Sequence, residues 1–106
     1  MPVLVIDDSR SSAAAIAQHV AGIAGLTASI CLDPVEALAQ CETTEFDLVL
    51  VDYVMPKLDG IELLTALRTL DSYRLVPMIM IASTLDVEVK RRAIQAGATD
   101  FLSKPC

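Results

Sequence analysis

The chain has 106 residues, which is enough for one domain and too few for two domains of ordinary size. Its formal net charge of −6 argues against nucleic acid or an anionic membrane surface as a partner, because both attract basic patches. Hydrophobic residues make up 54% of the sequence and aromatic residues only 4%, so we expect a core of aliphatic side chains.

We expect neither a secretory signal nor a membrane-spanning segment. Met1-Pro2-Val3 leads into an apolar run without a preceding basic region, and no apolar run is as long as a membrane span. The cysteines Cys31, Cys41 and Cys106 are odd in number and lack metal-ligand spacing, which favours free thiols in a reducing cytoplasm. His19 lies in a helical pattern without a second candidate ligand, and we expect it on the helix surface.

The first part of the chain alternates short apolar runs with helical patterns. We predict a buried strand at 2–6, a turn at 9–12, a helix at 13–24, an edge strand at 27–31 and a helix from 33 to about 41–44. Ile16, Val20 and Ile23 recur at helical spacing and should face the core, with Gly25 ending the helix. The next helix should start at Asp33-Pro34, and we expect Val35, Leu38 and Ala39 to face inward from it.

The second part continues the alternation. We predict a strand at 48–52, a loop closed by Asp59-Gly60, a helix from 61 to about 69, a strand at 78–82, a helix at 86–96 stopped by Gly97, and a strand at 99–103. Such alternation predicts right-handed crossovers and an α/β fold, a doubly wound five-stranded parallel sheet. A helix to cover the second face would be expected after the fifth strand. We therefore expect a fragment of a longer protein, a chain ended early, or cover supplied by a partner.

Charged residues gather at the carboxyl edge of this predicted sheet. Asp7 and Asp8 end the first strand, Asp52 ends the third, and Lys104 follows the fifth. With strand order 2-1-3-4-5, the first and third strands are neighbours at the topological switch point, where ligands bind in such sheets. Clustered carboxylates suit Mg²⁺, and the lysine adds positive charge for a phosphoryl group. This pattern predicts an aspartate, Asp52, that accepts phosphate.

Several motifs resemble the receiver domain of two-component response regulators, chemotaxis receivers included. They are Val3-Leu4-Val5-Ile6-Asp7-Asp8-Ser9, Leu50-Val51-Asp52-Tyr53-Val54-Met55-Pro56 with Asp59-Gly60, Gln95-Ala96-Gly97-Ala98, and Lys104-Pro105. The resemblance covers the whole chain, 1–106, and implies a flavodoxin-like sheet whose last helix is missing from this chain. Any output domain would lie beyond Cys106.

The resemblance also implies a role for each matching residue. Asp52 matches the phosphoacceptor, and Asp7 and Asp8 match the acidic pair that binds Mg²⁺, with Asp8 as the direct ligand. The metal would also contact Asp52 and the backbone carbonyl of Val54. Lys104 matches the family's invariant lysine.

The chain departs from the family at the switch that responds to phosphate. Phe101 matches the aromatic switch position, but Ala82 stands where the family has a threonine or serine hydroxyl. One interpretation is that the fourth strand ends early, so that Ser83 or Thr84 reaches the site from the loop. The other is that the hydroxyl is missing and phosphorylation couples weakly to the signalling face.

The resemblance implies a regulatory domain that catalyses only its own phosphorylation and dephosphorylation. A histidine kinase or phosphotransfer protein would donate the phosphoryl group. The response would change a contact with a linked or separate output domain, or within a homodimer. The alternative is a receiver-like interaction module with weakened or lost phosphate switching. An aspartyl phosphatase of the haloacid dehalogenase type is disfavoured. In that family the nucleophile ends the first strand and a second acid lies two residues later, whereas here Asp7 and Asp8 are adjacent and Asp52 stands alone on the third strand.

Overall fold

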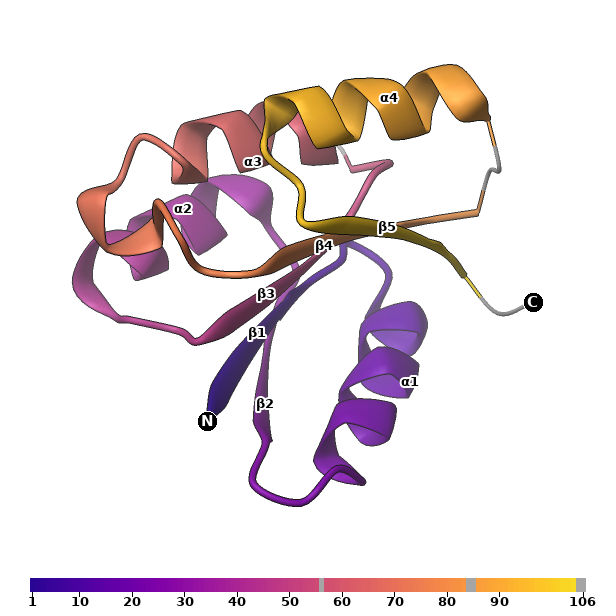
Figure 1. The fold of residues 1–106 in the computed structure, drawn as a ribbon. Coiled ribbons are helices and arrows are strands. Elements are labelled where there is room, and N and C mark those ends of the chain that lie inside the picture. Colours follow the sequence, from indigo (N-terminus) through magenta and orange to yellow (C-terminus); the bar gives the residue numbers. More distant parts are fainter. Residues whose placement is uncertain (56, 84–85, 105–106) are drawn as a thin grey trace.

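The computed structural model describes residues 1–55, 57–83 and 86–104, and contains one parallel sheet (Figure 1). Its strands are β1 (Pro2–Ile6), β2 (Thr27–Cys31), β3 (Leu48–Asp52), β4 (Met78–Ala82) and β5 (Asp100–Ser103). The strands lie in the order β2-β1-β3-β4-β5, which confirms the predicted topology and the edge position of residues 27–31.

Four helices connect the strands, with a short 3₁₀ turn before β4. They are α1 (Arg10–Ala21), α2 (Pro34–Thr43), α3 (Gly60–Leu67), η1 (Asp71–Tyr73) and α4 (Val87–Ala96). Helices α2, α3 and α4 cover one face of the sheet, and α1 covers the other (Figure 1). Successive strand residues alternate between these faces: Val49 and Val51 join the core under α2–α4, whereas Leu48 and Leu50 belong to the α1 side.

The predicted start of α2 is confirmed by its cap, whereas α1 begins at Arg10, inside the turn predicted at 9–12, because Ser9 caps the helix there. The Asp33 carboxylate accepts a hydrogen bond of 2.8 Å from the Val35 N–H, and Pro34 takes the first helical position. Asp59 and Glu62 form a reciprocal capping box at the start of α3. Gly97 ends α4 in the left-handed region, with φ of 114°, as expected for a glycine stop.

Two expectations about helix faces and ends are wrong. Helix α1 ends at Ala21, and Ile23 is 55% exposed instead of facing the core, because the chain turns at Gly22 where helix propensity is low. In α2, Val35 and Ala39 are exposed. The side chains that α2 buries are instead Pro34, Ala37 and Cys41, because Pro34 itself packs inward and sets a stripe at helical spacing.

Other expectations about single residues hold. His19 is exposed on the last turn of α1, as predicted. Cys31 and Cys41 are buried free thiols, whereas Cys106 lies outside the described residues. Within those residues, no helix is long and apolar enough to cross a membrane.

Candidate functional site

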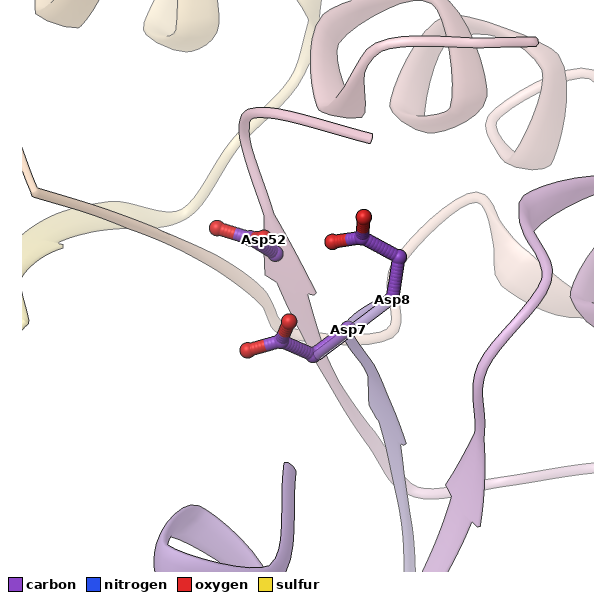
Figure 2. A group of neighbouring side chains, drawn as sticks. All are labelled: Asp7, Asp8 and Asp52. Atoms are coloured by element: carbon purple, nitrogen blue, oxygen red, sulfur yellow. The ribbon is translucent and has the colours of Figure 1, made fainter. Parts of the chain in front are cut away.

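Three carboxylates meet where β1 and β3 end (Figure 2). Ile6 pairs with Val51 across the two strands, so Asp7 and Asp52 leave neighbouring strands at the same edge. Each of Asp7, Asp8 and Asp52 offers a carboxylate oxygen within 4.8 Å of the other two. Asp7 is fully buried and Asp52 is 6% exposed, whereas Asp8 faces solvent. The sheet topology thus brings together the three acids that the sequence predicted at this edge.

Lys104 completes this group from the end of β5. Its Nζ lies 3.2 Å from Asp7 Oδ2 and 3.1 Å from Asp52 Oδ1, so one ammonium bridges both buried carboxylates. The Lys104 N–H donates a hydrogen bond of 2.7 Å to the Ala82 carbonyl, which extends the β4–β5 ladder to the lysine. The site therefore carries three acids and one cation, with an excess of negative charge.

This environment shifts the pKa of Asp52. Burial, the largest effect, raises the pKa of Asp52 to about 6, and the nearby Asp7 carboxylate adds to the rise while Lys104 opposes it. Burial alone would lower the pKa of Lys104, but its contacts with Asp52 and Asp7 outweigh burial and raise that pKa. At neutral pH most Asp52 carboxylates are ionised, and a positive charge added to the site would stabilise them.

Local hydrogen bonds fix the Asp7 side chain. Its Oδ1 accepts a bond of 2.9 Å from the Ser9 N–H, and the Ser9 hydroxyl in turn caps α1 by accepting from the Ser12 N–H. The same sequence that starts α1 therefore orients Asp7 toward Lys104.

Gly60 is a residue whose importance the sequence reasoning missed. A Cβ built on Gly60 would lie 2.4 Å from the Asp52 carbonyl oxygen and 2.9 Å from Tyr53 Cα. The Gly60 N–H donates to the Tyr53 carbonyl at 2.8 Å, so the start of α3 lies directly against the end of β3. The Asp59-Gly60 pair was the signal for this contact, although its reading as a loop closure gave no hint of the steric reason.

The loop after β3 carries a second contact that was not predicted. Lys57 Nζ lies 2.8 Å from Asp33 Oδ2, which joins this loop to the N-cap of α2. Lys57 also adopts a positive φ of 73°, uncommon for a residue with a side chain. Val54 lies in the same loop and is exposed, and its carbonyl as a metal ligand stays a prediction.

The predicted switch residues occupy different surroundings. Phe101 is buried in the core under α2–α4, in the same cluster as Ala82. Strand β4 ends at Ala82, and Ser83 is exposed in the bend that follows. Thr84 lies outside the described residues. Ser83 is thus in the loop, as the first interpretation of the switch requires, but a hydroxyl contact with the site stays a prediction.

The donor atoms of the site fit a hard divalent cation. The three acids offer only oxygen, within 4.8 Å of one another, and Lys104 alone does not neutralise them. Mg²⁺ prefers oxygen ligands and commonly takes one or two carboxylates while keeping several waters. Asp7, Asp8 and Asp52 are therefore the described residues suited to hold it.

A family model and curated relatives both match this chain, and they point to the same family. The model of the response regulator receiver domain matches residues 3–106. The chain is 39% identical over 106 residues to the cyclic di-GMP phosphodiesterase response regulator RpfG of Xanthomonas campestris pv. campestris (strain 8004), covering 96% of the chain and 28% of that protein. It is 34% identical over 103 residues to the transcriptional regulatory protein PrrA of Mycobacterium leprae (strain TN), covering 97% of the chain and 43% of that protein. The chain thus spans less than half the length of either relative.

Solved structures share the fold. The Francisella response regulator 1452 receiver domain matches with a TM-score of 0.87 and 33% identity, over 98% of this chain and 84% of that one. Vibrio cholerae chemotaxis protein CheY4 matches with a TM-score of 0.88 and 32% identity, over 99% of this chain and 87% of that one. Motifs, topology, site and relatives agree, and the chain belongs to the response regulator receiver domain family.

Proposed function

We propose that this receiver domain is the phosphoacceptor module of a two-component phosphorelay, with Asp52 accepting a phosphoryl group from a histidine kinase or a phosphotransfer protein. The observation that carries the proposal is the shared contact of Lys104 with Asp7 and Asp52 beside Asp8. A buried carboxylate with a raised pKa, next to a cation at the carboxyl edge of a parallel sheet, is typical of a functional site.

The transfer step uses the ionised form of Asp52. The carboxylate supplies the electron pair for the new P–O bond, so no proton has to leave Asp52 during the attack. The P–N bond of the donor phosphohistidine breaks, and the imidazole keeps that electron pair and leaves neutral when its other nitrogen is protonated. Lys104 Nζ, 3.1 Å from Asp52 Oδ1, is placed to pair with the arriving phosphoryl oxygens.

We assign Mg²⁺ binding to Asp7, Asp8, Asp52 and the backbone carbonyl of Val54. When bound, the ion would supply positive charge that offsets repulsion between the acids and the phosphoryl oxygens. The excess of acid over Lys104 in the site supports this assignment.

The response to phosphate would involve Ser83, Thr84 and Phe101. The alternative, an interaction module with weakened phosphate switching, is favoured by Ala82, which is buried and carries no hydroxyl at the family's switch position. Ser83→Ala separates the two interpretations. If the Ser83 hydroxyl holds the phosphoryl group, its removal should weaken the spectroscopic changes that phosphorylation causes in the domain. If Ser83→Ala leaves those changes intact and Ala82→Thr enlarges them, the weakened switch is the better description.

We propose the partners of this domain from the relatives it resembles. Both curated relatives described above are much longer than this chain, and the name of one describes a phosphodiesterase and that of the other a transcriptional regulator. We propose an output domain, linked or separate, or a second copy of the domain, as the partner whose contact changes.

Leu102 is 48% exposed on the α1 side of the sheet, and we propose that a further helix or a partner covers it. A reducing cytoplasm suits the free thiols of Cys31 and Cys41.

The test is phosphorylation of the purified domain by acetyl phosphate with Mg²⁺, followed by intact-mass measurement. We expect one phosphoryl adduct on the wild type, none on Asp52→Asn, and an unchanged adduct on the exposed control Asp47→Asn. An unmodified wild type would contradict the proposal.

A further inference from the structure

Two contacts hold the loop between β3 and α3 to the end of β3 and to the core. The Gly60 N–H donates to the Tyr53 carbonyl at 2.8 Å, which closes the base of the loop. The Met55 side chain is buried in the core under α2–α4. Val54 lies between these contacts and is 66% exposed. The base of the loop is therefore fixed, and the position of its tip depends on a further contact.

That further contact is an ion pair that crosses the end of β1. Lys57 Nζ lies 2.8 Å from Asp33 Oδ2. Lys57 belongs to the loop after β3 and Asp33 to the turn after β2, and β1 lies between these two strands in the sheet. The pair therefore spans the place where β1 ends and where Asp7 and Asp8 follow. Within residues 1–55, 57–83 and 86–104 no second ion pair joins these two loops.

The conformations at both ends of this ion pair are defined. Asp33 uses Oδ1 to cap α2, by accepting from the Val35 N–H at 2.8 Å, and this leaves Oδ2 for the lysine. Lys57 has a positive φ of 73°, which residues with a side chain rarely adopt and which persists only where the surroundings impose it. The tip of the loop is thus tied to a rigid anchor, the first turn of α2.

We propose that Lys57 is a positioning residue for Mg²⁺, which through Asp33 holds the loop after β3 across the end of β1 and keeps the Val54 carbonyl within reach of the ion. The inference rests on the proposed function, because the ion and its contact with Val54 belong to that proposal. The two charges of the pair cancel, so we assign the pair a geometric role. Ligands that come from separate strands bind one ion well only when the loops that carry them are held at a fixed separation.

Removing both charges at once separates position from charge. The variant Asp33→Asn/Lys57→Met keeps the net charge of the wild type, and asparagine caps a helix as well as aspartate does, so α2 should keep its start. We expect this variant, purified and unphosphorylated, to bind Mg²⁺ about two- to fivefold more weakly than the wild type, which is the loss expected for an exposed ion pair. Titration with Mg²⁺ at constant ionic strength, followed by amide NMR, measures the dissociation constant and shows in the same spectra whether the variant is folded.

The single variants would reveal an effect of charge alone. In that case Lys57→Met would tighten Mg²⁺ binding, Asp33→Asn would weaken it, and the double variant would match the wild type. That pattern would overturn the proposal. Lys57→Arg should bind Mg²⁺ as the wild type does, because a guanidinium can still pair with the Asp33 carboxylate. A loss in Lys57→Arg as large as in the double variant would contradict the ion pair as the cause.

A matched control removes another exposed ion pair, the one that Arg91 and Glu88 form on α4. Glu88→Gln/Arg91→Met again leaves the net charge unchanged, and its affinity for Mg²⁺ should equal that of the wild type. A loss equal to that of Asp33→Asn/Lys57→Met would remove the special role of Lys57. A wild type that binds no Mg²⁺ would overturn the metal site of the proposed function together with this inference, whereas equal binding by the wild type and the first double variant would overturn this inference alone.

Discussion

Asp52→Asn should make the domain more stable at neutral pH in the absence of metal. Asparagine resembles the neutral carboxyl in size and shape and removes the negative charge that burial and Asp7 disfavour. The pKa of Asp52 rises from 3.8 to about 6 in the folded domain, and a shift of about two units corresponds to about 3 kcal/mol. Because Asn cannot reproduce every contact of a neutral carboxyl, we expect a gain of roughly 1–3 kcal/mol in the free energy of unfolding.

The pH dependence of this gain follows from proton binding. Between the ordinary pKa of an aspartate and about 6, the folded domain binds more protons at Asp52 than the unfolded chain does. The contribution of Asp52 to stability therefore falls as pH rises through this window and stays low above it. The advantage of Asp52→Asn should be small near pH 4 and complete near pH 7.

Urea unfolding followed by circular dichroism, at several pH values and with a chelator present, measures this effect. Asp47→Asn serves as a control, because Asp47 is exposed and its substitution should change the free energy by less than about 0.5 kcal/mol. An Asp52→Asn variant that is less stable than the wild type at pH 7, or a gain of equal size at pH 4 and pH 7, would refute the reasoning.

Three further changes test the site and its supports. Mg²⁺ at ten times its dissociation constant should raise the free energy of unfolding of the wild type by about 1.4 kcal/mol, and that of Asp52→Asn by less. An unchanged unfolding midpoint at millimolar Mg²⁺ would count against the metal site. Gly60→Ala should lower the free energy of unfolding in urea by about 1–3 kcal/mol, because its Cβ would overlap the Asp52 carbonyl. The control Gly22→Ala should be nearly neutral, because its Cβ meets atoms no closer than 3.4 Å. Equal costs for the two variants would remove the steric explanation. Tyr73→Phe should lower the free energy of unfolding by about 1–3 kcal/mol, because the buried Phe46 N–H, which lies 2.9 Å from the Tyr73 hydroxyl, loses its acceptor. A cost below about 0.5 kcal/mol would show that another group accepts this hydrogen bond instead.

The strands and the site were predictable from the sequence for a shared reason. Short apolar runs such as residues 48–51 are buried on both faces of the sheet, and this pattern by itself predicts a strand. Parallel order then places Asp7, Asp52 and Lys104 at one edge without any knowledge of loop shape. The acids and the lysine could therefore be grouped before their distances were known.

The helix details and loop contacts were less predictable because they depend on tertiary packing. The alanine-rich pattern of α1 continues past Gly22, so nothing in its periodicity marks the end at Ala21. Contacts such as Lys57 with Asp33 and Arg68 with Gly97 join residues 24 and 29 positions apart through loop geometry. The steric need for Gly60 likewise depends on how closely α3 approaches the end of β3.

The measurement that tests the central claim most directly is the location of the phosphoryl group. The domain would be treated with acetyl phosphate and Mg²⁺, digested, and its peptides sequenced by mass spectrometry, with Asp52→Asn in parallel. We predict the modification on Asp52 alone in the wild type and on no residue in the variant. A phosphoryl group on Asp7 or Asp8, or a variant modified as fully as the wild type, would contradict the account.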